Sequence, residues 1–174
     1  SLVFFGLIAG CWIFGFIRLY EAPKPGHSDT RLRIVQPNIP QELKWNPRLR
    51  NQHLDKLVQL SKGPGKASIK HIIWPETAIP FLVAPNTNLS SVIGNIIPSG
   101  GLLWAGSLTT ARDSESQLRL FNSLLVVDER GKVRAKYDKH HLVPFGEYIP
   151  FRDFLGISKI TKGRTDFTSG SKPT

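Results

Sequence analysis

The chain has 174 residues, 40% of them hydrophobic and 21% charged. This length and apolar content support one folded domain with a core and exclude a disordered chain. The formal net charge is +10, which would suit anionic lipid head groups or nucleic acid. Because Lys and Arg are scattered and no nucleic-acid-binding motif accompanies them, we expect no nucleic-acid partner.

Cysteine and histidine usage limits the chemistry that the chain can carry by itself. Cys11 is the single cysteine, so an intrachain disulfide and a thiolate metal cluster are both excluded. The histidines show no paired ligand spacing, and we expect neither a metal nor a cofactor. The sequence contains no methionine, and we therefore expect it to be an internal piece of a longer protein.

The N-terminal region reads as the end of a membrane span. Residues 2–17 form an uncharged apolar run, and Arg18 and Tyr20 behind it are typical interfacial anchors. A transmembrane helix needs about twenty apolar residues, so we predict that residues 1–20 are the C-terminal part of one. A signal-peptide core and a buried helix are the alternatives; the first lacks a basic start and a small-residue cleavage site. Residues 21–30 are rich in Pro, Gly and polar residues and predict a linker.

Residues 31–174 are expected to form one α/β unit. A helix is predicted to begin at Pro47 and to bury Leu54, Leu57 and Val58, and a second one over 89–97 follows the capping residue Asn88. The predicted strands are 31–36, 69–74, 102–108, 121–127 and 132–137, the last two joined by a hairpin turn at 128–131. This order predicts a layered α/β domain with a mixed sheet. The polar tail 158–174 is predicted to be a loop.

One candidate catalytic group follows the strand that ends at Trp74. Pro75 has no N–H to donate, so the strand is expected to stop there and to leave Glu76 just beyond its carboxyl end. Ligands and catalytic groups of open α/β sheets collect at that edge. For an isolated glutamate, a carboxylate that caps a turn is the simpler interpretation. The apolar residues 81–83 that follow are expected either to lie in a loop that dips toward the membrane or to pack in the core.

A second candidate, Lys139, also lies just past a predicted strand. It could therefore meet Glu76 above the same edge of the sheet. A lysine close to a carboxylate is held protonated and can stabilise an oxyanion, while the carboxylate can act as a general base. The alternative is an ordinary exposed ion pair, which contributes little energetically.

Three segments together resemble one enzyme family. The sequence WPETAIP at 74–80 and YDKHHLVPFGEYIP at 137–150 resemble the glutamate and lysine motifs of the nitrilase superfamily. The segment HLVPFGEYIP, together with QPNIPQELKW at 36–45, is similar to sequences of the apolipoprotein N-acyltransferases within that superfamily. This resemblance implies a nitrilase-like α-β-β-α sandwich that is incomplete at its C-terminus, preceded by the end of a transmembrane helix.

The resemblance also implies roles for four residues. Glu76 would be the general base and Lys139 would stabilise the oxyanion. Glu147 would be a supporting carboxylate, and Trp45 would lie on a substrate-side loop, although a packing role is equally open for an aromatic residue. The family's nucleophilic cysteine should follow the next strand, which this chain does not include. Cys11 lies in the apolar run and cannot replace it, because a nucleophilic thiol needs an accessible, electropositive setting; we expect the chain alone to be inactive.

The function implied is transfer of a fatty acyl chain from a phospholipid to the N-terminal diacylglyceryl-cysteine of an apolipoprotein, through a cysteine thioester. The implied partners are the phospholipid donor, the lipoprotein acceptor and the bilayer. The implied location is the bacterial inner membrane with the catalytic domain in the periplasm. Two alternatives stay open: a nitrilase-fold amidase acting on a small C–N bond, and an inactive membrane-tethered relic or binding module.

Overall fold

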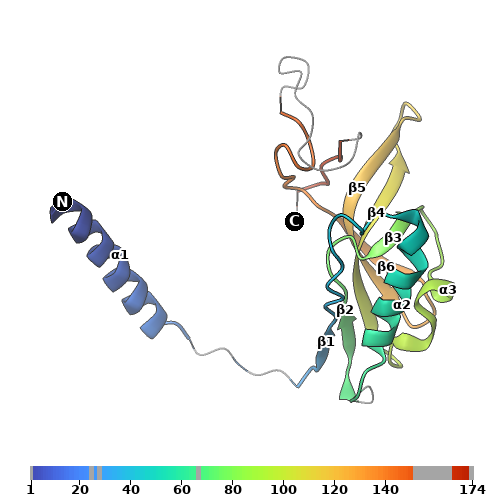
Figure 1. Cartoon of the computed structure of the whole chain (residues 1–174), viewed down its shortest axis with the longest axis horizontal. Helices are drawn as coiled ribbons and strands as arrows, with labels where there is room; N and C mark the ends of the chain where they lie inside the picture. Colours follow the sequence, from blue (N-terminus) through green and yellow to red (C-terminus); the bar gives the residue numbers. More distant parts are fainter. Residues whose placement is uncertain (1, 24–25, 27–28, 66–67, 151–165, 173–174) are drawn as a thin grey trace.

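The computed structural model describes residues 2–23, 26, 29–65, 68–150 and 166–172. The chain begins with helix α1, Leu2–Tyr20, in which no residue is buried. With a mean hydropathy of 2.1, α1 is long and apolar enough to cross a membrane. The α/β unit begins further along the chain with β1 (Figure 1).

The α/β unit is built on one six-stranded sheet, which is mixed as the sequence pattern predicted and has one strand more than predicted. Strands β1, β2 and β4 run parallel, and β3 pairs parallel with β4. Strands β4, β5 and β6 pair antiparallel in turn, so β6 runs in the same direction as β2. The strands are β1 Leu32–Ile34, β2 His71–Ile73, β3 Ile79–Val83, β4 Leu102–Arg112, β5 Leu118–Asp128 and β6 Val133–Asp138.

Helices cover one face of this sheet (Figure 1). The 3-10 helix η1, Pro47–Leu49, is capped by the Asn46 side chain and continues into α2, Arg50–Ser61. The second predicted helix is shorter than expected: α3, Ser90–Ile93, passes into the 3-10 helix η3, Gly94–Ile96, because the backbone leaves the helical region at Asn95. Asn88 does cap it, since its Oδ1 accepts a hydrogen bond from the Ser90 N–H at 2.7 Å.

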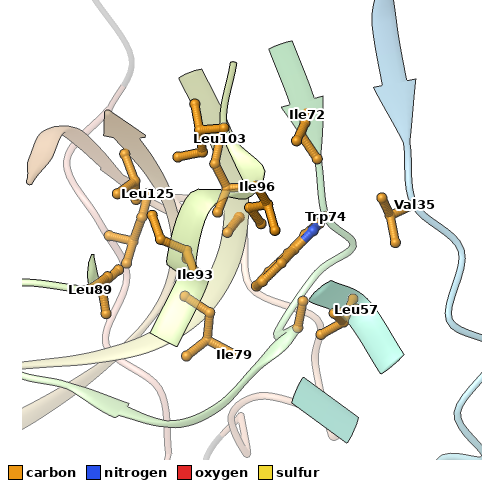
Figure 2. Packing of buried hydrophobic residues seen from close by; sticks show 14 of the residues in the cluster. Val35, Leu57, Ile72, Trp74, Ile79, Leu89, Ile93, Ile96, Leu103 and Leu125 are labelled. Carbon is orange, nitrogen blue, oxygen red and sulfur yellow. The ribbon is translucent and has the colours of Figure 1, made fainter. Parts of the chain in front are cut away.

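The core lies between the helices and the sheet, with Trp74 at its centre (Figure 2). Trp74 is 2% exposed, and its indole N–H donates to Ser61 Oγ at 2.9 Å. Ser61 Oγ in turn donates to the Leu57 carbonyl at 2.7 Å, so the indole N–H and this hydroxyl are both satisfied in the core. Leu57 is fully buried as predicted, whereas the two other helix residues expected in the core, Leu54 and Val58, are partly buried at its margin.

The opposite face of the sheet presents alternate residues of the same strands. On it Ile34 is 75% exposed, Tyr137 44% and Trp104 37%. The described residues thus form one sheet with helices on one of its faces and an exposed apolar stretch on the other.

Strand β3 was not predicted, and residues 81–83 lie in this strand rather than in a loop. Val83 is 3% exposed and packs in the core, and Leu82 is 55% exposed. Pro80 argues against a strand in the sequence, but β3 pairs with β4 at the side of the sheet, where a residue without an N–H is tolerated.

Candidate active site

Glu76 is held above the sheet by main-chain bonds on both sides of it. After β2 the Trp74 N–H donates to the Trp104 carbonyl at 2.8 Å, the Gly106 N–H donates to the Pro75 carbonyl at 3.2 Å and the Ala78 N–H donates to the Gly106 carbonyl at 2.8 Å. The loop passes so close to β4 that a Cβ on Gly106 would lie 2.5 Å from the Glu76 Cα. Glycine is therefore required beneath the loop.

Lys139 is placed by the end of β6, which points to the same edge of the sheet as the end of β2. The main-chain N–H of Lys139 donates to the main-chain carbonyl of Asn122 in β5 at 2.8 Å. One residue further along β5, Ser123 Oγ donates to Asp138 Oδ1 at 2.5 Å and shares a 2.6 Å hydrogen bond with Thr109 Oγ1. These bonds tie the end of β6 to β5 and β4.

The structure brings three of the sequence-predicted residues together. Lys139 Nζ lies 3.5 Å from Glu76 Oε1 and 3.1 Å from each carboxylate oxygen of Glu147. The Asn122 side-chain amide bridges the two carboxylates, donating to Glu76 Oε1 at 2.5 Å and to Glu147 Oε1 at 2.8 Å. The result is a cluster of two carboxylates, one ammonium and one amide.

Glu147 is the more enclosed of the two carboxylates. Its side chain is 12% exposed, against 64% for Glu76, and its Oε2 also accepts the Val143 N–H at 2.8 Å. Burial opposes ionisation of Glu147, but hydrogen bonds from Val143, Asn122 and Lys139 outweigh it and lower the pKa of the carboxyl. Glu147 is therefore a carboxylate at neutral pH.

Lys139 is held in its charged form by these neighbours. Partial burial works to lower its pKa, but the hydrogen bond to Glu147 and the charges of Glu76 and Glu147 together raise the pKa above its ordinary value. A protonated lysine beside an exposed carboxylate can supply positive charge to a developing oxyanion while the carboxylate accepts a proton.

The cluster opens into a cavity of about 680 Å³. Trp45, the fourth predicted residue, lines it and is 42% exposed. The turn that carries Trp45 also contributes Lys44, whose Nζ donates to the Glu76 carbonyl at 3.0 Å. Phe167 of the tail completes one wall, with its N–H donating to the Glu147 carbonyl at 2.9 Å.

Sequence reasoning missed Asn122 and Lys44. Asn122 stands in the apolar strand β5, and asparagine is depleted in strands, so its presence there was an available signal. Lys44 carried no signal of its own, because a lysine in a turn is usually solvated.

The structure thus brings a glutamate and a lysine together at one edge of a mixed α/β sheet, as the two sequence motifs implied. The chain belongs to the carbon-nitrogen hydrolase family, whose sequence model matches residues 31–158. This confirms the nitrilase-like fold class predicted from the sequence.

Among proteins of this family the chain is similar to curated apolipoprotein N-acyltransferases. It is 32% identical to the one from Rhodopseudomonas palustris, over 95% of this chain and 33% of that protein. It is 37% identical to the one from Brucella suis, over 91% of this chain and 31% of that protein. The chain thus spans about a third of the length of these curated relatives.

Solved structures with similarity to the chain include amidases. An N-terminal amidase is 19% identical, with a TM-score of 0.45 over 64% of this chain and 28% of that chain. The amidase from Nesterenkonia sp. AN1 is 15% identical, with a TM-score of 0.44 over 87% of this chain and 52% of that chain.

Proposed function

We propose that this chain supplies the general base and the oxyanion-stabilising lysine of an apolipoprotein N-acyltransferase. The observation that carries the proposal is the cluster in which Lys139 contacts both Glu76 and Glu147. The similarity to curated N-acyltransferases over nearly the whole chain supports the choice of reaction. The nucleophile is proposed to be a cysteine encoded beyond the codon for Thr174.

In the proposed reaction, Glu76 takes the proton of the thiol, and the thiolate attacks the ester carbonyl of a phospholipid. Lys139 stabilises the tetrahedral oxyanion, a lysophospholipid leaves, and a thioester remains. The α-amino group of a diacylglyceryl-modified N-terminal cysteine of an apolipoprotein then attacks the thioester and releases the enzyme. Glu147 keeps Lys139 charged and in place, and Trp45 lines the side from which the lipid enters.

We further propose that α1 anchors the enzyme in the bacterial inner membrane with the α/β unit on the periplasmic side. Both substrates are lipids and leave the bilayer only at high cost, so an anchored site meets them at the interface. The apolar and fully exposed surface of α1 is what a helix solvated by lipid would have. Cys11 lies on this apolar helix, which does not provide the electropositive setting that a nucleophilic thiol requires.

The first experiment is to sequence the gene beyond the codon for Thr174. An open frame with a cysteine after the next strand supports the proposal, and an immediate stop codon refutes it in favour of an inactive membrane-tethered module. The complete gene product is then incubated with phospholipid vesicles, and the acyl thioester is trapped and identified by mass spectrometry.

Two variants and one control test the residue roles in that assay. Glu76→Gln and Lys139→Ala should each abolish thioester formation. Glu42→Gln should leave it unchanged, because Glu42 lines the same cavity without belonging to the cluster. Normal thioester formation by either of the first two variants would refute the role assigned to that residue. Hydrolysis of small amides with no acylation by phospholipid would favour an amidase instead.

A further inference from the structure

Lys44 joins the turn of residues 41–45 to the loop that carries the proposed base. The turn is closed by its own hydrogen bonds, from the Leu43 N–H to the Pro40 carbonyl and from the Asn46 N–H to the Leu43 carbonyl, each 3.0 Å long. From it the Lys44 side chain reaches a residue 32 positions further along the chain, where Nζ donates to the Glu76 carbonyl at 3.0 Å. Both residues line the same cavity.

The carbonyl that Lys44 binds belongs to the peptide that enters a strained residue. Thr77 has a φ of 48°, a left-handed conformation that is unfavourable for residues other than glycine. The loop is fixed to Gly106 before this point, through Pro75, and after it, through Ala78. Lys44 adds a bond at the peptide between these two attachments, where the chain would otherwise relax most easily.

The charge of Lys44 fits this role. Burial lowers the pKa of Lys44, and the attraction of the Glu76 charge opposes that change. The attraction between the two charges thus adds to the hydrogen bond that Lys44 donates to the main chain of Glu76. A charge-assisted bond of this kind is stronger than a bond between neutral groups.

We propose that Lys44 is a positioning residue for the general base. It fixes the Glu76–Thr77 peptide and couples it to the turn that presents Trp45 on the lipid side of the cavity. This inference rests on the proposed function, because it assumes that Glu76 is the base.

The test compares Lys44→Met, which keeps the aliphatic stem and removes the amine, with Lys44→Arg, which keeps donors and charge. Thioester formation by the complete gene product from phosphatidylethanolamine vesicles is measured against donor concentration. With Lys44→Met, the maximal rate should fall between about 10- and 100-fold, as expected for a misplaced catalytic group. Lys44→Arg should retain most of the maximal rate.

Lys56→Met, an exposed position on α2, is the matched control and should behave as the unmodified protein. An unchanged maximal rate for Lys44→Met overturns the proposal. So does an effect confined to the donor concentration at half-saturation, which would make Lys44 a ligand of the donor head group. If Lys44→Met does not fold, Lys44→Arg carries the test, and loss of rate in a folded Lys44→Arg protein overturns it. Activity of Glu76→Gln would instead refute the proposed function itself.

Discussion

Replacing Gly106 with alanine tests whether the sheet itself places the proposed base. An ideal Cβ at this position would lie 2.5 Å from the Glu76 Cα, from the Pro75 carbonyl oxygen and from the Thr77 nitrogen. All three are main-chain atoms, so no flexible side chain can move aside. The loop must therefore rise from β4 by about 1 Å to restore ordinary contact distances.

This displacement has two expected costs. Overpacking that forces a backbone shift lowers the free energy of unfolding by about 1–3 kcal/mol. Because Glu76 is carried by the same loop, the rate of thioester formation in the complete gene product should fall about 100-fold, the typical effect of a 1 Å misplacement. The two hydrogen bonds between Gly106 and the loop should lengthen at the same time.

The assay is denaturant unfolding of the chain in detergent micelles, with Gly63→Ala as the control. At Gly63 the nearest atom to an added Cβ is the Leu60 carbonyl oxygen at 3.5 Å, an ordinary contact, so its stability should change by less than about 0.5 kcal/mol. Suppose Gly106→Ala unfolds with the same free energy as the unmodified chain, and its Glu76 carboxylate stays 3.5 Å from Lys139 Nζ. The claim that close contact with Gly106 places Glu76 would then be wrong.

Three further changes probe the cluster and the core. Asn122→Ala removes the amide that bridges both carboxylates, and the lost bond to enclosed Glu147 should lower the free energy of denaturant unfolding by about 1.5–3 kcal/mol. Glu147→Gln should reduce the loss of stability in acid. Although burial opposes ionisation, hydrogen bonding lowers the pKa of Glu147 below 4.5 in the folded chain. The ionised carboxylate therefore stabilises the fold fully above pH 4.5, and this stabilisation is lost as pH falls through the folded-state pKa. Melting curves from pH 7 to pH 3 measure this, and Glu42→Gln should leave them unchanged. Trp74→Phe leaves Ser61 Oγ without the indole N–H and should cost about 1–3 kcal/mol in denaturant unfolding; a change below 0.5 kcal/mol would show that this bond contributes nothing net.

The sequence alone located the parts of the site that depend on strand ends. A proline after a short apolar strand predicted where β2 stops, and the hairpin turn predicted the direction of β6. Residues that follow the carboxyl ends of two strands can meet at the same edge of a sheet, which is why the sequence predicted that Glu76 and Lys139 could meet.

The rest of the site depends on contacts that local pattern does not encode. Strand β3 is paired with β4 despite Pro80, because tertiary pairing outweighs local preference at the side of a sheet. Asn122 acquires its two partners from segments 46 and 25 positions away, and Lys44 acquires its partner from 32 positions away. Such pairs follow from the register of the sheet and the path of the loops, neither of which is readable from the spacing of residue types.

The charges of the cluster argue for Glu76, rather than Glu147, as the base. Two carboxylates share one ammonium, so one negative charge remains in excess. Lys139 contacts both oxygens of Glu147 at 3.1 Å but Glu76 at 3.5 Å, and Glu147 also accepts bonds from Val143 and Asn122. A proton placed on Glu147 would weaken all of these contacts, whereas Glu76 is 64% exposed and has fewer to lose. The enclosed carboxylate therefore keeps the lysine charged, and the exposed one is available to take a proton from a thiol.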